Sequence, residues 1–451
     1  MVKASTPRAN RPFHQTPSPN QDVTVFSGGI RVSYPDGFRV EGDGKICFRW
    51  LPSPALRFAV TQPGVFSLCG FDATRLSGVS IDVPDMGIAG LSGEVLLVAP
   101  SLDPPEVCAA GVLRDTLSVP DQGIAFKELA FDAANYHQYF GDPVEGDGGR
   151  CWRGRLSVEA DPWVIEIDET SDARERINAV RSAGGHVITH AGALKRKDGS
   201  SFCFADTAEI RSALSVWLSF TRGFWCSPLF WHCRSDCWVD YSVPRLSRWR
   251  GVRSWLPYEE CAHALAVFPR LVRLLADPVW KDPIEFAIHW YIHANENSAG
   301  VEGSLVLVQT ALEMLAWTYL VEHKRVLTKK EWDDVGRARF RLEKLLVELE
   351  IPKDLPSECP SLRKWAKSAG KDMSGMDALV AIRNAFVHPV KNNLEMALAV
   401  PSCAKVEAWA LSLLYLEATI LTLLKYDGPI YSRLRNALPG EARVEKPWVL
   451  V

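Results

Sequence analysis

The pattern of apolar residues changes most clearly near residue 257, and this change constrains the fold most strongly. Before it, short runs rich in β-branched and aromatic residues alternate with turn signals such as Pro35-Asp36-Gly37. After it, apolar residues recur at helical spacing between capping residues. Because one sheet or one bundle cannot satisfy both patterns, the sequence predicts a multidomain α+β protein.

Four parts are expected along the 451 residues. Residues 1–20, rich in Pro, Ser, Asn and Arg and without an apolar core, are interpreted as a disordered tail and not as a signal peptide. Residues 21–169 are predicted to form a β-rich sandwich or barrel-like module, and residues 170–256 a small α/β module with a connector. Residues 257–451 are predicted to form an all-α bundle.

Helix starts in the last part are predicted by three capping patterns, which are Asp282 with Pro283 and Glu285, Thr328 with Glu331, and Ser374 with Asp377. Five helices are expected, near residues 283–297, 302–323, 329–350, 375–388 and 402–426. Two of these stretches approach membrane length, but Gln309, Glu313 and Glu417 within them would be costly against lipid. We therefore expect buried bundle helices and no membrane span.

Composition narrows the class of protein further. Hydrophobic residues make up 47% and charged residues 23%, which are ordinary proportions for a globular protein. The net charge of -3 gives no overall nucleic-acid signal, so any basic binding surface must be local. Eleven cysteines are scattered without paired spacing, which favours free thiols in a reducing cytoplasm.

Polar residues gather at the end of the helix predicted for residues 375–388. Asn384 and His388 are four positions apart and share one edge of that helix, and Arg383 beside them is long enough to converge on the same place. Pro389 ends the helix and keeps His388 in its last turn, near the negative end of the helix dipole. These three side chains are therefore expected to lie together.

An Arg followed directly by Asn, with His five positions after the Arg, resembles the motif of HEPN domains. A long helix with Gln309 and Glu313 before the motif and a long apolar helix after it stand in the expected order, over roughly residues 282–426. Within that superfamily the chain is most similar to the Apea-type branch of bacterial anti-phage proteins. The resemblance implies a HEPN-like bundle that forms a homodimer and acts as an endoribonuclease without metal or cofactor, in phage defence or a toxin-like response.

The chemistry of these residues suits that activity. RNA can be cut by its own 2′-hydroxyl attacking the adjacent phosphate, which requires a proton shuttle and a cation for the developing charge. His388 is suited to the first task and Arg383 to the second, while Asn384 could orient the phosphate or the imidazole. Two His388 side chains in a dimer could then act as base and acid.

Other interpretations of the same residues stay open. Arg and Asn near a helix end commonly satisfy main-chain carbonyls, and HEPN bundles also serve as non-catalytic interaction or nucleotide-binding modules. Glu313, with Gln309 one turn away, could orient Arg383 or could form a structural ion pair with another arginine of the bundle. By analogy only, the first two modules would either sense a trigger, which the sequence does not identify, or hold the nuclease inactive.

Two further sets of residues are candidates for nucleic-acid binding. Arg248, Trp249, Arg250 and Arg253 interleave cations with an aromatic ring, which suits RNA but is also common in connectors between domains. From Lys324 to Lys344 there are eight basic residues, which could supply an RNA-binding rim or simply a solvated helix face.

Two groups of potential metal ligands are interpreted as structural. His289 and His293 lie one helical turn apart, but the position after the first is Trp290 where the metalloprotease signature needs Glu. The second group, which is Cys226, His232, Cys233 and Cys237, lacks the spacing of a zinc knuckle, so burial is the preferred explanation. No metal site is expected.

Overall fold

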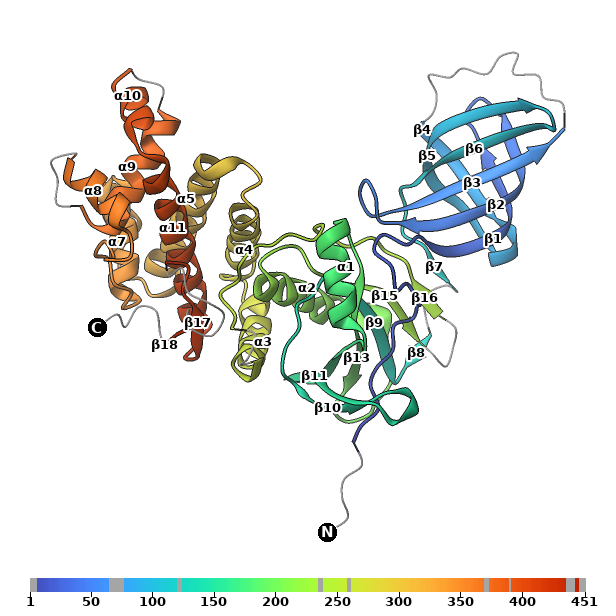
Figure 1. The fold of residues 1–451 in the computed structure, drawn as a ribbon, viewed down its shortest axis with the longest axis horizontal. Helices are drawn as coiled ribbons and strands as arrows, with labels where there is room; N and C mark the ends of the chain where they lie inside the picture. Colours follow the sequence, from blue (N-terminus) through green and yellow to red (C-terminus); the bar gives the residue numbers. More distant parts are fainter. Residues whose placement is uncertain are drawn as a thin grey trace, which may run out of the picture.

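The computed structural model describes residues 6–64, 77–119, 124–233, 238–257, 261–368, 373–388, 391–434 and 443–445. A β-barrel lies at one end of the molecule, a helical region at the other, and a mixed α/β domain between them (Figure 1). The expected multidomain α+β architecture, with β-rich N-terminal and helical C-terminal parts, is confirmed.

Six antiparallel strands close the barrel in the order β1-β2-β3-β6-β5-β4. Their bounds are β1 (Val23–Ser33), β2 (Arg39–Arg49), β3 (Ala55–Pro63), β4 (Ser77–Val83), β5 (Ile88–Leu102) and β6 (Pro105–Leu113). In β6, buried and more exposed residues alternate, as expected where one face of each strand lines the interior. The barrel therefore has a hydrophobic core, with Phe48 and Phe58 among its largest side chains, and this core continues into the middle domain at Phe230.

The middle domain is built on an eight-stranded sheet in the order β10-β11-β12-β13-β9-β15-β16-β7. Its strands are β7 (Ser118–Val119), β9 (Glu128–Ala134), β10 (Asp142–Glu145), β11 (Cys151–Ala160), β12 (Trp163–Glu169), β13 (Ile188–Arg196), β15 (Pro228–Cys233) and β16 (Trp238–Asp240). Two helices, α1 (Ala173–Ala183) and α2 (Ala208–Arg222), and a small pair, β8 (Ala125–Phe126) with β14 (Phe202–Cys203), complete it.

The predicted boundary between residues 169 and 170 is wrong. It separates β12 from β13, although these strands pair from Trp163 with Arg196 through Glu169 with His190. The boundary instead follows the barrel, between β6 and β7. Turn signals locate strands along a sequence, but they do not show which distant strands pair. The first strands of the middle domain were therefore assigned to the preceding β-rich module.

The N-terminal segment is also not a disordered tail where the structure describes it, from residue 6 onward. The backbone N–H of Asn10 donates to Asp168 over 2.6 Å, and that of Phe13 donates to Asp132 over 3.1 Å. The backbone N–H of Asn20 donates to the His186 carbonyl over 2.8 Å. Polar composition predicted disorder, but this segment satisfies buried carboxylates of the sheet instead.

The helical region contains more helices than the sequence predicts. They are α3 (Cys261–Ala276), α4 (Lys281–Asn295), α5 (Gly300–Trp317) with a π-helical extension (Thr318–His323), α6 (Lys329–Val335), α7 (Ala338–Glu348), α8 (Pro360–Ser368), α9 (Gly375–Val387), α10 (Lys391–Ala399) and α11 (Ser402–Leu423), followed by the short strands β17 (Pro429–Tyr431) and β18 (Arg443–Glu445). The sequence did not predict α3, α8 or α10.

Two of the three predicted capping boxes are confirmed, at Thr328 and Ser374. The third is wrong, because α4 begins after Trp280 without a side-chain cap and Asp282 lies inside its first turn. The single helix predicted for residues 329–350 is divided into α6 and α7 at Gly336, whose φ of 63° is incompatible with a continuous helix.

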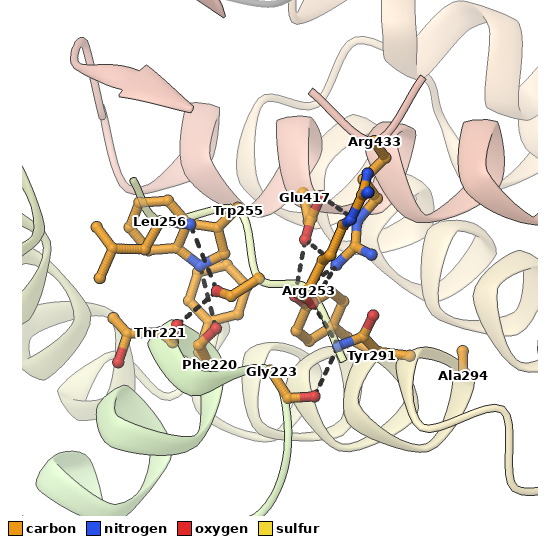
Figure 2. Close-up of polar contacts among 12 residues, drawn as sticks. Phe220, Thr221, Gly223, Arg253, Trp255, Leu256, Tyr291, Ala294, Glu417 and Arg433 are labelled. Atoms are coloured by element: carbon orange, nitrogen blue, oxygen red, sulfur yellow. Dashed lines mark hydrogen bonds and ion pairs between the residues drawn. The ribbon is translucent and has the colours of Figure 1, made fainter. Parts of the chain in front are cut away.

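Two helices, Gly300–His323 and Ser402–Leu423, are long and apolar enough to cross a membrane by length and composition. More than half of each is buried inside the protein, at 56% and 67% of the most apolar window. Glu417 in the second is fully buried, accepts from the Tyr291 hydroxyl and pairs with Arg433 (Figure 2). Most of each apolar window therefore packs against the rest of the protein, as expected for buried bundle helices.

A buried histidine lies where the barrel meets the middle domain. The His186 ring stacks on Trp50 with centroids 5.3 Å apart, and neither ring nitrogen has a hydrogen-bond partner among the described residues. Burial, with Arg248 nearby, lowers the pKa of His186 to about 4 from the usual 6.5. The neutral ring therefore contributes stability above pH 6.5 that is lost as the pH falls toward 4.

Replacing His186 with phenylalanine is expected to stabilise the protein by about 2 kcal/mol more at pH 5 than at pH 8, because phenylalanine keeps the stacking and cannot be protonated. Urea unfolding at both pH values measures the difference. The matched control is His323→Phe at an exposed position, which should show no such dependence. An equal effect of His186→Phe at both pH values would contradict the prediction.

Candidate active site

A cavity of about 870 Å³ lies in the helical region beside the end of α9. All five residues predicted for the catalytic site line it, namely Gln309, Glu313, Arg383, Asn384 and His388. Two helices distant in sequence, α5 and α9, contribute them. The structure thus brings the predicted residues to one place.

The geometry of α9 sets the position of the motif. The Ser374 hydroxyl accepts from the Asp377 N–H, which fixes where the helix begins. His388 follows the last helical residue in an extended conformation, with its N–H donating to the Asn384 carbonyl over 3.1 Å. Its side chain is exposed at the cavity. The histidine therefore lies at the C-terminus of the helix, just beyond the last turn in which it was expected, and can be reached from solvent.

Arg383 and Asn384 contact each other directly. Arg383 Nη1 donates to Asn384 Oδ1 over 3.1 Å, and both side chains are half-buried. This bond fixes the amide so that its Nδ2 group can donate to a bound ligand. The pair is therefore arranged to offer N–H donors from two side chains.

Three more arginines line the same cavity, and they come from the start of α7. They are Arg337, Arg339 and Arg341. The chain changes direction at Gly336, between α6 and α7. As a result, the start of α7, which the sequence predicted only as a possible RNA-binding rim, lies beside α9. Arg339 pairs with Asp377 at 3.0 Å, whereas Arg337 is exposed and forms no ion pair in the part of the chain that the structure describes. Four arginines thus face two carboxylates, Glu313 and Asp377.

Within the part of the chain that the structure describes, several polar atoms of the cavity are buried without a hydrogen-bond partner. They are Nε of Arg383, Nε of Arg339 and Oε1 of Gln309. An unsatisfied buried polar group costs about 1–3 kcal/mol, and native proteins contain few of them. Their gathering at one cavity indicates a site that a polar ligand would complete.

Glu313 has a different partner from either one predicted. It accepts a hydrogen bond of 2.6 Å from Gln309 Nε2, and within the described residues it forms no ion pair with Arg383 or with another arginine. It nevertheless lines the same cavity as Arg383. An effect of Glu313 on Arg383 would therefore act through space or through a ligand.

The residues considered as metal ligands are packed as structural side chains. The Cys226 thiol is fully buried, donates to the Ala134 carbonyl, and has its pKa raised to about 12 by burial. His289 and His293 stack near Trp225, with centroids 5.5 and 6.0 Å from its ring. Cys237 lies outside the described residues. Across the described ranges, no cluster of three or more His, Cys, Asp or Glu side chains could hold a metal ion.

The four connector residues predicted to bind RNA lie at two different places in the structure. Arg248 donates to the Pro52 carbonyl of the barrel. Trp249, Arg250 and Arg253 instead line a second cavity, in the middle domain. Sequence spacing suggested one continuous surface, but this extended segment directs its side chains to two different domains.

Two family models match the chain. Residues 121–252 match the YopA central domain and residues 277–445 match the YopA C-terminal domain. The SPbeta prophage-derived uncharacterized protein YopA of Bacillus subtilis (strain 168) is 27% identical over 441 residues, which is 95% of each chain. No solved structure matches. The two matched ranges correspond to the middle domain and to the helical region from the end of α3, and the barrel lies outside both.

Proposed function

We propose that the chain is a metal-independent endoribonuclease of HEPN type that acts in the cytoplasm. The observation that carries this proposal is the convergence of Arg383, Asn384 and His388 on one solvent-accessible cavity. A role in anti-phage defence or a toxin-like response is part of the proposal, and the prophage origin printed in the name of the Bacillus relative fits a function in phage biology.

The arrangement suits cleavage by the 2′-hydroxyl of the RNA. His388 is the exposed imidazole at the cavity, and imidazole is the side chain that most often takes or gives a proton in enzymes. Arg383 offers an unsatisfied Nε–H to the developing negative charge on the phosphate, and Asn384 adds its amide N–H. The arginines from α7 supply the positive field that holds the RNA backbone.

One chain supplies one His388 to this cavity. The reaction is fastest when one group acts as a base on the 2′-hydroxyl and a second group acts as an acid that protonates the leaving oxygen. A homodimer through the helical region would supply the second histidine. Apolar side chains exposed around the motif support such an interface, namely Val387 on α9, Leu398 on α10 and Val406 on α11. Light scattering of the active protein tests the dimer, and full activity as a monomer would exclude it.

The test of the activity uses the purified full-length protein and total RNA in excess chelator. We expect fragments that end in 2′,3′-cyclic phosphate, since the nucleophile is the 2′-hydroxyl of the substrate. Fragments that appear only with added magnesium would argue for a different reaction. If RNA binds to the protein without being cut, the helical region would instead be a non-catalytic interaction or nucleotide-binding module. This is the alternative function that the sequence left open.

The Glu313→Gln variant is expected to lower kcat about tenfold, with little change in KM and an unchanged Tm. Glutamine keeps the shape and can still accept from Gln309, so only the negative charge near Arg383 is lost. Cleavage kinetics and thermal unfolding measure the two effects. A fall in Tm that accounts for the lost activity would assign Glu313 a purely structural role.

A further inference from the structure

A second cavity, of about 1,030 Å³, lies in the middle domain, away from the predicted catalytic residues. It is formed by α1, the loop after β9, the start of β11 and the connector at residues 249–253. Six arginines line it, namely Arg153, Arg174, Arg181, Arg222, Arg250 and Arg253, against a single carboxylate, Glu169. This imbalance of charge favours a ligand that carries several negative charges.

Most of these arginines have no carboxylate to neutralise them. Arg153, Arg174, Arg181 and Arg250 form no ion pair within the described ranges, and all four are exposed. Arg174 and Arg181 are seven residues apart on α1, so they project from the same face of that helix. Like charges held close together raise the free energy of the folded protein, and a bound anion would relieve that repulsion.

Glu169 opposes this positive field only weakly near neutral pH. Its side chain is buried and accepts a hydrogen bond of 2.5 Å from the Tyr139 N–H. Burial raises the pKa of Glu169 to about 7. A protonated carboxyl can also donate to a ligand atom, which a carboxylate cannot do.

Aromatic rings share the cavity with the arginines. They are Tyr139, Phe140, Trp152 and Trp249. Phe140 is 69% exposed, which is unusual for a large apolar side chain with no partner to cover it. Trp249 lies close to Arg181 and Arg222, whose guanidinium carbons are 5.6 and 4.8 Å from its ring centroid. Flat apolar rings beside fixed cations can stack on a base while the cations bind its phosphates.

We propose that this cavity binds a ribonucleoside polyphosphate, with its phosphates against the arginines of α1 and the connector and its base against the aromatic rings. The volume is close to the upper end of the range of about 300–1,000 Å³ that is typical of small-ligand sites, which favours a free nucleotide over a long RNA strand. The site is separate from the proposed nuclease centre and does not depend on it.

The connector residues that line this cavity form hydrogen bonds with the helical region. The Arg253 carbonyl accepts from Asn295 Nδ2 over 2.9 Å and from Arg433 Nη2 over 3.2 Å (Figure 2 shows Arg253 and Arg433). Arg250 Nη1 donates to the Glu296 carbonyl over 3.4 Å. A bound nucleotide would hold the connector from one side while these bonds hold it from the other, so amide hydrogen exchange at residues 249–253 should slow on binding.

The experiment is calorimetric titration of the full-length protein with each of the four ribonucleoside triphosphates, with tripolyphosphate and with adenosine. We expect at least one triphosphate to bind at least about tenfold more tightly than tripolyphosphate, and adenosine to bind more weakly than both. Arg174→Ala/Arg181→Ala should weaken triphosphate binding at least about tenfold. Phe140→Ala should weaken the triphosphate and leave tripolyphosphate unchanged.

The matched control is Arg39→Ala/Arg273→Ala, which removes two exposed arginines outside the cavity. No triphosphate binding at millimolar concentration would overturn the proposal, as would equal affinity for triphosphate and tripolyphosphate. So would a short single-stranded RNA that binds far more tightly than any triphosphate and loses its affinity in the α1 variant, because the cavity would then be part of an RNA path. RNA cleavage is not a readout, so loss of the proposed nuclease function would leave this test intact.

Discussion

The His388→Ala variant is expected to cleave RNA about a hundred- to ten-thousandfold more slowly than the wild-type protein, which is the usual contribution of a positioned general acid or base. The imidazole is exposed at the cavity and its main chain is fixed by the bond to Asn384, so the substitution removes the proton shuttle without opening a buried space. The measurement is the initial rate of appearance of cyclic-phosphate ends in chelator.

Two companion variants separate chemistry from binding. Arg383→Lys keeps a positive charge but loses the planar donor geometry, so we expect an intermediate loss of kcat, while Arg383→Ala should be as slow as His388→Ala. The exposed His323 provides the matched control, and His323→Ala should retain the wild-type rate. A His388→Ala protein that cuts RNA as fast as the His323→Ala control would remove the nuclease proposal.

The local features of the helical region were predictable from sequence because local chemistry determines them. The capping boxes at Thr328 and Ser374 depend on residues three positions apart, and the structure contains both. The approach of α5 to α9 was one of two interpretations that the sequence left open for Glu313, which together with Gln309 interrupts a largely apolar helix. Gln309 and Glu313 line one cavity with Arg383, Asn384 and His388 in the structure.

Features that depend on long-range pairing were not predictable. Nothing local to β12 or β13 shows that Ile167 pairs with Gly192 in one sheet, so the domain boundary was misplaced. The arginines of the middle-domain cavity lie as far apart as Arg153 and Arg253, and only the folded sheet brings them together. Polar composition likewise misjudged the N-terminal segment, because its partners Asp132 and Asp168 are more than a hundred residues away.

A buried ion pair lies beside the joint between the middle domain and the helical region (Figure 2). Glu417 accepts from Arg433 through both carboxylate oxygens, at 2.5 and 2.7 Å, and its side chain is fully buried. Tyr291 donates to the same carboxylate over 2.7 Å. The partner carboxylate and the phenol raise the pKa of Arg433 despite its burial, so the guanidinium is charged at any pH that proteins tolerate.

Glu417→Gln is therefore expected to lower the free energy of unfolding of the helical region by about 3–5 kcal/mol, because it leaves the Arg433 cation buried without its counter-charge. Removing both charges in Glu417→Gln/Arg433→Met should recover a large part of that loss. The matched control is Glu348→Gln in the exposed pair with Lys344, which should cost no more than about 0.5 kcal/mol. Urea unfolding followed by far-UV circular dichroism compares the three. A double variant no more stable than Glu417→Gln would mean that the hydrogen bonds from Arg433 to Tyr291 and Arg253, and not charge compensation, dominate at this joint.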